Sequence, residues 1–548
     1  MKKSILILFL FLISFKISYS QKTNKPKLVI GLVIDQMRYD YLYRFSEKYG
    51  DKGFKRLLKE GFHLENTHYN YIPTKTAVGH SSIYTGTTPQ NHGIIGNNWY
   101  DKSLKQSIYC VDDSNYNSVG TNGTSGQKSP YKLHTTTITD QLRLAQNLKG
   151  KTISIAIKDR SAILPGGHTA NAAYWFEGGE EGNWITSSFY METLPEWVIK
   201  FNNNGNVEHY LNQSWDTYYP IETYTESIID NNPYEGTFIG ESKPVFPHNI
   251  PELKKLNDNF SLLKMIPAGN SITTDFTIAA IEGEQLGQSN EQIDFLAISY
   301  SSTDYVGHRY GVDSKEIEDT YIRMDLEIAR LLTYLDKHIG KNEYTLFLTA
   351  DHAVAQTPNY LNSLKIPGGY FDDVKFNEYI KSLSLKQFNS DKIIENISNY
   401  QLFFDKAELK RLNLQTIDVE NFFAEELLNF DKVYKTITAH TLQTSEFTQG
   451  IYGLVQQGYN QKRSGNVFII PDPSVIGSGN KKTGTTHGSG YSYDTHVPLI
   501  FFGFGIKQGS SNKYYPIIDI APTLANLLQI EFPNGVTGKI IDEALEHN

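Results

Sequence analysis

The chain alternates short, continuously apolar runs with longer stretches whose apolar residues recur at helical intervals. The clearest apolar run, Leu28 to Ile34, stops abruptly at a polar residue, and similar runs cover Thr152–Ile157, Ile293–Tyr300 and Tyr344–Leu348. Such runs are typical of strands buried on both faces in a parallel sheet. We therefore expect an α/β fold with a mostly parallel central sheet.

Helical periodicity predicts the elements between these runs. Apolar residues recur at helical spacing within Tyr41–Gly61, where Gly61 is a plausible stop, and helices are also predicted over 272–287 and from about Lys315 to His338. The last segment, Ile517–Leu528, contains a proline near the start of a further predicted helix. Strands that alternate with helices predict helices on both faces of the sheet.

Two regions break the alternation. Residues 170–260 are rich in Tyr, Asn and Trp and only weakly periodic, so we expect an irregular insertion there. Residues 360–480 mix predicted helices with β-rich pieces and are interpreted as an inserted cap region. Within that range, helices are predicted over 376–383, 407–411 and 419–428, and β-rich pieces over 450–457 and 466–470. Residues 21–548 are thus interpreted as one catalytic domain with two insertions.

Composition excludes several classes of protein. The 548 residues are 39% hydrophobic and 20% charged, which is typical of a soluble globular chain. The net charge is −9, and the sequence contains no long basic run and no zinc-finger spacing. A nucleic-acid-binding module is therefore not expected. Any anionic ligand would have to be held by a few local cations.

The N-terminus predicts export. Residues 1–20 combine the charged start Met1-Lys2-Lys3, an apolar core from Ile5 to Ile13 and small residues before Gln21, as in a secretory signal peptide. We expect a periplasmic or secreted protein without a membrane anchor after cleavage. The single cysteine, Cys110, cannot form an intramolecular disulfide and is interpreted as a buried apolar residue.

Acidic and imidazole side chains follow three of the predicted strands. Asp35 follows the first strand, Asp304 and His308 follow the strand ending at Tyr300, and Asp351 with His352 follows the strand ending near Leu348. Each aspartate alone would suit an ordinary loop. Open α/β sheets, however, bind ligands at the carboxyl ends of their strands, and Asp and His are suitable zinc ligands.

The stretch from Tyr71 to His80 contains the candidate nucleophile, Thr76. Pro73 forces an extended backbone before it, and the small residues Ala77 and Gly79 lead into a possible helix. A helix N-terminus offers free N–H groups to a phosphate or sulfate, but a threonine hydroxyl attacks only when a base or metal activates it. The ordinary alternative is a capping threonine.

Candidate anion-binding groups lie elsewhere in the chain. Lys158 and Arg160 follow a predicted strand, and on an extended segment they would project to the same side. Lys158 would contribute a point charge, and Arg160 a planar guanidinium that can donate two hydrogen bonds to one anion. Alternatively, both side chains are solvated surface charges. A Gly/Asn-rich loop at 91–100 offers an amide donor, and a glycine-rich loop at 484–491 carries His487.

Taken together, these motifs resemble the alkaline phosphatase superfamily, and within it the monomeric bacterial PafA-type enzymes. The resemblance covers essentially the whole mature chain. The residues that carry it are Asp35, the Pro73-Thr74-Lys75-Thr76 segment, Asn97, Lys158-Asp159-Arg160, Asp304 with His308, Asp351-His352 and Thr486-His487-Gly488.

The resemblance implies an alkaline-phosphatase-like three-layer sandwich with two zinc ions. One ion would be held by Asp304, His308 and His487, and the other by Asp35, Asp351 and His352 with the Thr76 oxygen beside it. Asn97, Lys158 and Arg160 would contact the phosphoryl oxygens of the substrate. The resemblance also suggests a monomer.

The implied activity is zinc-dependent hydrolysis of small-molecule phosphate monoesters, with broad specificity, through a phosphothreonine on Thr76. The alternative is a nucleotide pyrophosphatase/phosphodiesterase of the same superfamily, in which a Lys/Arg pair around the phosphoryl oxygens is not expected. A sulfatase would need cysteine or serine in place of Thr76. An inactive binding protein would be expected to lose ligands, yet every expected position is filled.

Overall fold

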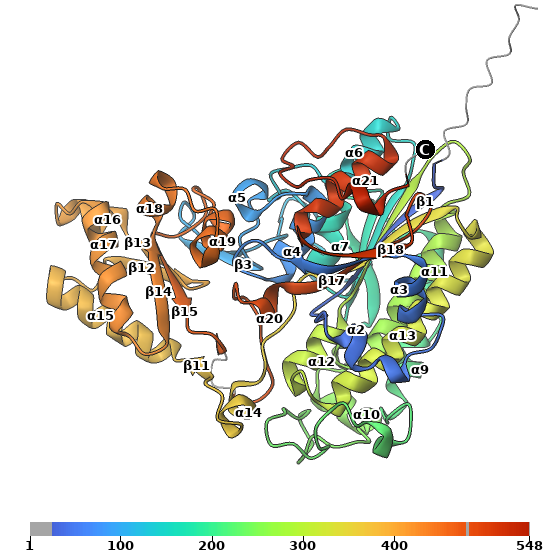
Figure 1. Cartoon of the computed structure of the whole chain (residues 1–548), viewed down its shortest axis with the longest axis horizontal. Coiled ribbons are helices and arrows are strands. Elements are labelled where there is room, and N and C mark those ends of the chain that lie inside the picture. Colours follow the sequence, from blue (N-terminus) through green and yellow to red (C-terminus); the bar gives the residue numbers. More distant parts are fainter. Residues whose placement is uncertain (1–24, 478–481, 547–548) are drawn as a thin grey trace, which may run out of the picture.

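The computed structural model describes residues 25–477 and 482–546 and is built around one ten-stranded sheet (Figure 1). The predicted signal peptide at residues 1–20 lies outside the described residues. The strand order is β18-β2-β17-β10-β1-β9-β6-β7-β8-β5. The sheet is mixed but mostly parallel at its centre, which confirms the predicted α/β class.

The centre of the sheet is formed by the apolar runs. Strand β1 (Leu28–Ile34) lies between β9 (Asp294–Tyr300) and β10 (Tyr344–Thr349), and β6 (Thr152–Ala156) follows on the other side of β9. All four run parallel to one another. Every residue of β1 is buried, as expected for a strand covered on both faces.

Both edges of the sheet contain antiparallel strands. Strands β17 (His496–Gly503), β2 (Phe62–His68) and β18 (Gly509–Pro516) extend it beyond β10, and β7 (Ala172–Glu177), β8 (Asn183–Ser187) and the short β5 (Ser118–Val119) extend it beyond β6. Strands β7 and β8 lie in the range predicted to be irregular. Strand β7 pairs with β6, and β8 pairs with β7 and β5, so their burial comes from the sheet and from neighbouring helices, which local periodicity does not reveal.

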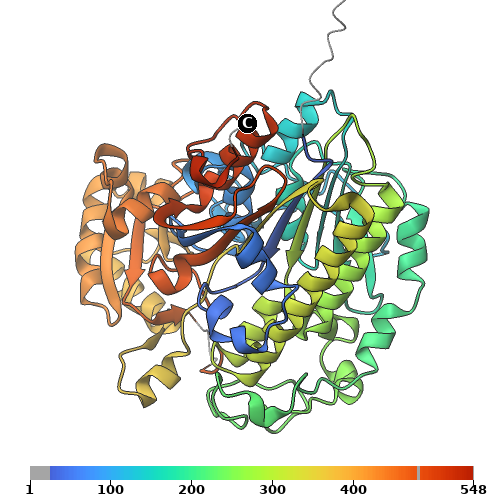
Figure 2. The ribbon, with the colours of Figure 1, turned by 45° about the vertical axis from the view of Figure 1, so that its right-hand side comes forward.

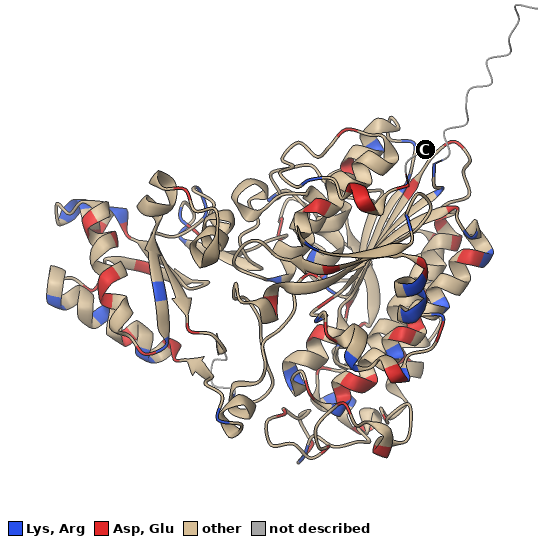
Figure 3. Ribbon diagram, in the orientation of Figure 1, with Lys and Arg blue, Asp and Glu red and all other residues tan. Residues whose placement is uncertain are grey.

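Helices cover both faces of the sheet (Figure 2). One layer contains α4 (Thr76–Thr85), α6 (Ile138–Ala145), α7 (Asp159–Gly166) and α21 (Ile520–Leu528), and the other contains α2 (Tyr41–Arg44), α3 (Phe54–Glu60), α11 (Ala268–Glu284), α12 (Ser302–Tyr310) and α13 (Lys315–Leu335). Charged residues gather on the outer helices, whereas the central strands carry few (Figure 3).

A second, smaller unit projects from the core between residues 369 and 477 (orange in Figure 1). Its four-stranded sheet has the order β12-β13-β15-β14, formed by β12 (Ile394–Ser398), β13 (Gln401–Phe404), β15 (Val467–Pro471) and β14 (Val433–Thr438). Helices α15 (Asp373–Phe388), α16 (Lys406–Arg411) and α17 (Thr416–Glu426) surround a hydrophobic cluster of its own. We call this unit the cap.

One element of the cap differs from its prediction. The β-rich interpretation of residues 450–457 is wrong, because they belong to helix α19 (Gly450–Gly458). Ile451, Leu454 and Val455 recur at helical spacing, and Val455 packs in a cluster that also contacts Ile72 of the core. Tertiary packing thus selects the helix over the β preference of these branched residues.

No helix within the described part of the chain has both the length and the apolar character needed to cross a bilayer.

Candidate active site

The predicted ligands meet because the strands that precede them are neighbours. Asp35 directly follows β1, Asp304 lies in the first turn of α12 after β9, and Asp351 and His352 directly follow β10. Lys158 follows β6. These four strands are adjacent and parallel, so their carboxyl ends share one edge of the sheet.

One cluster of ligand atoms contains Asp35, Asp351 and His352, as predicted, and these atoms lie within 4.8 Å of one another. The Nε2 atom of His352 is 3.6 Å from Asp35 Oδ1 and 3.5 Å from Asp351 Oδ2. Both carboxylate oxygens are buried and have no hydrogen-bond partner among the described residues. Buried, unpaired carboxylate oxygens beside an imidazole nitrogen suit a divalent cation.

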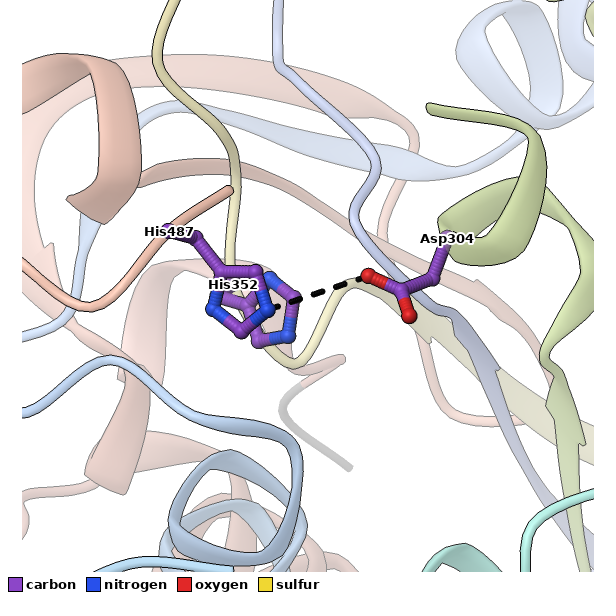
Figure 4. Close-up of side chains that lie close together, drawn as sticks. All are labelled: Asp304, His352 and His487. Carbon is purple, nitrogen blue, oxygen red and sulfur yellow. Dashed lines mark ion pairs between the residues drawn. The ribbon is translucent and has the colours of Figure 1, made fainter. Parts of the chain in front are cut away.

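A second cluster is centred on Asp304. Its Oδ1 atom is 3.1 Å from His308 Nε2 and 3.8 Å from His487 Nε2, so the structure brings together all three residues of the other predicted set. His352 also belongs to this cluster, because its ring stacks on His487 with 3.4 Å between centroids. Figure 4 shows the two stacked imidazoles on loops facing the Asp304 carboxylate on α12.

The three histidines present the same nitrogen to the site. The Nδ1 atoms of His308, His352 and His487 lie 2.8, 3.1 and 2.7 Å from the carbonyl oxygens of Thr485, Ala353 and Thr74, respectively. A carbonyl partner holds the proton on Nδ1 and leaves the Nε2 lone pair free to bind a metal. Burial lowers the pKa of His352 and of His487, which favours neutral rings.

The carboxylates differ in their electrostatics. Burial raises the pKa of Asp35 to about 6, although the Lys158 ammonium opposes this shift. Burial, with the charge of Asp35 nearby, also raises the pKa of Asp351. Burial acts in the same direction on Asp304, but positive charge on His308 and Lys158 outweighs it and holds the pKa of this carboxyl well below its usual range. The site therefore concentrates negative charge that needs cationic partners.

Thr76 is the first residue of α4 and is almost fully buried. Its Oγ1 atom lies 3.5 Å from His352 Nε2, beside the first cluster. The cap position of α4 is Lys75, so the interpretation of Thr76 as an ordinary capping residue is wrong. The side-chain oxygen of Asn97 instead accepts a 2.9 Å hydrogen bond from the Ala77 N–H, which leaves the Asn97 amide nitrogen as its donor end.

Lys158 lies between the two clusters. Its ammonium donates to Asp35 Oδ2 at 2.7 Å and to Asp304 Oδ2 at 2.6 Å. Arg160 is not on an extended segment, because the chain turns into α7 at Asp159; its Nη1 donates to the Tyr109 hydroxyl at 3.0 Å. The Nε of Arg160 is buried and has no partner within the described part of the chain.

Two supporting residues receive no individual role from the sequence patterns. Gln36, with a φ of 65°, donates its backbone N–H to Asp351 Oδ1 and its side-chain amide to Asp304 Oδ1, so it links the two clusters. Lys75 donates to the His487 carbonyl at 2.8 Å. In the sequence, Gln36 directly follows Asp35 and Lys75 directly precedes Thr76, and this adjacency to predicted site residues is the feature that points to them.

Two other supporting contacts lack such a signal. The Nδ1 atom of His80 lies 2.9 Å from the Thr76 carbonyl oxygen, and its Nε2 atom lies 3.0 Å from the Ser299 hydroxyl. Asp494 accepts hydrogen bonds from the Gly488 and Ser489 backbone and thereby orders the loop that carries His487. The donors precede Asp494 by six and five residues, so this contact is local to the loop, although no hydrophobic periodicity marks it.

Comparisons with known proteins give one consistent family. The family model described as type I phosphodiesterase / nucleotide pyrophosphatase matches residues 29–492. A protein named calcium-transporting ATPase from Myroides odoratus is 46% identical, over 97% of this chain and 97% of the relative. Alkaline phosphatase PhoV from Synechococcus elongatus is also 46% identical, over 96% of this chain and 94% of the relative.

Alkaline phosphatase PafA from Elizabethkingia meningoseptica is 44% identical, over 96% of each chain. The crystal structure of wild-type PafA matches the present fold with a TM-score of 0.91 at 42% identity, covering 95% of this chain and 99% of that one. The similarity therefore includes the fold and nearly the full length of both chains.

Proposed function

We propose a two-zinc, threonine-based mechanism for this chain, which belongs to the type I phosphodiesterase/nucleotide pyrophosphatase family and, within it, to the PafA-type alkaline phosphatases that hydrolyse phosphate monoesters. The family membership and the hydrolysis of phosphate monoesters follow from the comparisons above. The identity and number of the metal ions, the nucleophile and the phosphate contacts are the proposal.

The donor sets support zinc at both clusters. Each combines carboxylate oxygens with imidazole Nε2 atoms, whereas Mg²⁺ and Ca²⁺ prefer oxygen ligands alone. Asp35, Asp351 and His352 would hold one ion, and Asp304, His308 and His487 the other. When bound, a pair of zinc ions would supply Lewis-acid stabilisation of the attacking and leaving oxygens.

The chain's own residues would perform the transfer in two steps. The Thr76 hydroxyl loses its proton and its oxygen attacks phosphorus; the bond to the alcohol oxygen breaks, the alcohol leaves with one proton, and a phosphothreonine remains. Water then attacks phosphorus, the bond to the Thr76 oxygen breaks, and inorganic phosphate leaves while a proton from the water returns to Thr76. Asn97, Lys158 and Arg160 would donate to the non-bridging oxygens. The free N–H groups at the start of α4 add positive potential at the same point.

The observation that carries this proposal is the position of Thr76. Its hydroxyl is buried at a helix N-terminus, 3.5 Å from the imidazole nitrogen that both ligand clusters share.

The test is to compare Thr76→Ala with Thr76→Ser in the zinc-loaded protein. We expect Thr76→Ala to lose nearly all hydrolysis of an aryl phosphate and Thr76→Ser to retain much of it, because serine keeps a hydroxyl at the same place. Acid quenching followed by peptide mass spectrometry should find phosphate on Thr76, and elemental analysis should find two zinc ions per chain. Undiminished turnover by Thr76→Ala would falsify the assignment.

The alternative activity, cleavage of nucleotide or other phosphodiesters, is suggested by the description of the family model. The ratio of kcat/KM for an aryl phosphate to that for the matching aryl methyl diester separates the two activities. We expect a strong preference for the monoester. A preference for the diester would keep Thr76 as nucleophile but remove the proposed roles of Lys158 and Arg160.

We further propose that the enzyme is exported and acts as a monomer with broad specificity. The charged and apolar pattern of residues 1–20 supports export. Fractionation of expressing cells tests export, light scattering of the purified protein tests the monomer, and kcat/KM for a set of unrelated monoesters tests the breadth of specificity. Activity confined to the cytoplasm, a stable dimer, or hydrolysis of a single ester would contradict these three statements in turn.

A further inference from the structure

A cavity of about 280 Å³ lies where the cap meets the loops of the catalytic core. Its core side is formed by Pro73 and Lys75, just before Thr76, and by the loop that begins with His487. Its cap side is formed largely by aromatic and aliphatic side chains, including Phe371 and Tyr400. The reaction described above gives this cavity no role.

We infer that this cavity binds the alcohol portion of the substrate and that, within the broad range of monoesters proposed above, the enzyme prefers those of aromatic or bulky apolar alcohols. This inference rests on the proposed function, because it assigns the cavity to the leaving group of that reaction. It names a substrate class that neither the family nor the ligand clusters specify.

The cavity lies on the leaving-group side of the two ligand clusters. Of the six Asp and His ligands, only His487 is among the residues that line it. In an in-line displacement the leaving oxygen lies opposite the nucleophile. Thr76 lies beside the Asp35 cluster, so the leaving oxygen faces the cluster containing His487. The alcohol group would therefore extend toward the cavity.

The walls of the cavity are mostly aromatic and aliphatic, although the charged side chains of Lys75, Asp373 and Asp494 also contribute to the lining. Tyr491 and Tyr493 line the cavity, but their hydroxyls are engaged with the cap: Tyr491 donates to the Pro471 carbonyl at 2.8 Å, and Tyr493 accepts from the Ser474 N–H at 2.9 Å. Their rings, rather than their hydroxyls, are thus available to a ligand. Walls made mostly of aromatic and aliphatic side chains, with a few polar groups among them, favour an aromatic or aliphatic group.

The wall contributed by Tyr400 is preformed. Asn399 and Tyr400 both have positive φ angles, 52° and 57°, in the tight turn between β12 and β13. The Asn399 amide donates to the Asn98 carbonyl of the core at 2.8 Å, and the Tyr400 ring packs edge-on against Phe371 at 5.1 Å. A wall held in this way loses little entropy when a ligand binds.

The test uses two substrates whose alcohols differ in size but hardly in acidity, phenethyl phosphate and ethyl phosphate. Intrinsic reactivity is then matched, and a difference in kcat/KM reports the contacts of the phenyl ring. Burying such a ring predicts a preference for phenethyl phosphate of about tenfold to a hundredfold. Calorimetric affinities for benzylphosphonate and methylphosphonate, which cannot be hydrolysed, should differ in the same direction.

Variants locate the effect. Tyr400→Ala should remove most of the preference for phenethyl phosphate, and Tyr400→Phe should retain it. Ser398→Phe adds bulk from the same hairpin, so it should lower kcat/KM for phenethyl phosphate alone. Tyr131→Ala is the matched control, because Tyr131 is 77% exposed and lies outside the cavity. All four should hydrolyse ethyl phosphate at close to the wild-type rate.

The outcomes separate the inference from the proposed function. Equal kcat/KM for both esters, or a preference unchanged in both Tyr400→Ala and Ser398→Phe, would overturn the inference and leave the phosphatase mechanism intact. Failure to hydrolyse either ester would contradict the proposed function, and the two phosphonate affinities would then still decide whether the cavity binds an apolar group.

Discussion

Replacing Gly79 with alanine tests how closely the fold must hold the nucleophile. Gly79 lies in α4, one turn after Thr76, and packs against the segment that carries the predicted ligand Asp351. A Cβ atom at Gly79 would lie 2.1 Å from the Asp351 carbonyl oxygen and 2.9 Å from its Cα. An ordinary carbon–oxygen contact is about 3.3 Å, so the helix and the Asp351 segment must separate by roughly 1 Å.

The effect on stability is predicted to be modest and the effect on activity large. Alanine in a helix gains about 1 kcal/mol over glycine, and overpacking of this kind costs about 1–3 kcal/mol, so the free energy of unfolding should fall by up to about 2 kcal/mol. A shift of about 1 Å in the position of Thr76 relative to Asp351 and His352, however, should lower kcat/KM by about a hundredfold. Activity therefore reports the geometry better than unfolding does.

The assay is kcat/KM for an aryl phosphate with zinc-loaded protein, paired with urea unfolding. Gly123→Ala is the control, since the nearest atom to a Cβ there is 3.6 Å away, an ordinary contact. We expect the control to match the wild type in both measurements. A Gly79→Ala enzyme with wild-type kcat/KM would refute the idea that close packing of α4 on the Asp351 segment positions Thr76.

Three further predictions concern charge and reactivity. Lys158→Ala and Arg160→Ala should each lower kcat/KM for an aryl phosphate by about a hundredfold or more. The loss should be smaller for the aryl methyl diester, because a diester carries one fewer anionic oxygen. Equal losses for both substrates would contradict the proposed roles of Lys158 and Arg160. His248 is buried, but two neighbouring glutamates outweigh the effect of burial and raise its pKa to about 9. The folded protein then keeps a proton that the unfolded chain releases above pH ~6.5, so the free energy of unfolding should fall by up to about 3 kcal/mol as pH rises from about 6.5 to about 9. Urea unfolding across that range should show this slope in the wild type and a flatter one in His248→Gln; identical slopes would exclude His248 as the cause. Burial raises the pKa of the Cys110 thiol, so a thiol reagent should label Cys110 only after denaturation, and rapid labelling of the native protein would show that the site is accessible.

Much of the fold follows from local patterns in the sequence. The run Leu28–Ile34 coincides with β1 residue for residue, and Gly61 ends α3 as expected. An apolar run followed at once by an acidic residue identifies both a buried strand and the end at which a ligand binds. For this reason local patterns alone are enough to propose Asp35, Asp304 and Asp351 as ligands.

Other features are decided only by the tertiary structure. In residues 450–457 the β preference of Ile451 and Val455 competes with their helical spacing, and the packing of Val455 decides for helix α19. Strands β7 and β8 lie in a weakly periodic range, because the burial of β7 depends on its pairing with β6. The place of Lys158 between Asp35 and Asp304 is likewise not predictable, since it depends on β6 lying beside β9.

The sequence by itself therefore determined which residue types stand at the ends of which strands, and hence the class of chemistry. Periodicity and strand-end residues are local properties of the chain, so they can be recognised without knowing its partners. The tertiary structure decided how these residues combine: the strand order β10-β1-β9-β6 brings together Asp351, Asp35, Asp304 and Lys158 from segments up to 316 residues apart. Sheet order arises from long-range packing, which no local pattern encodes.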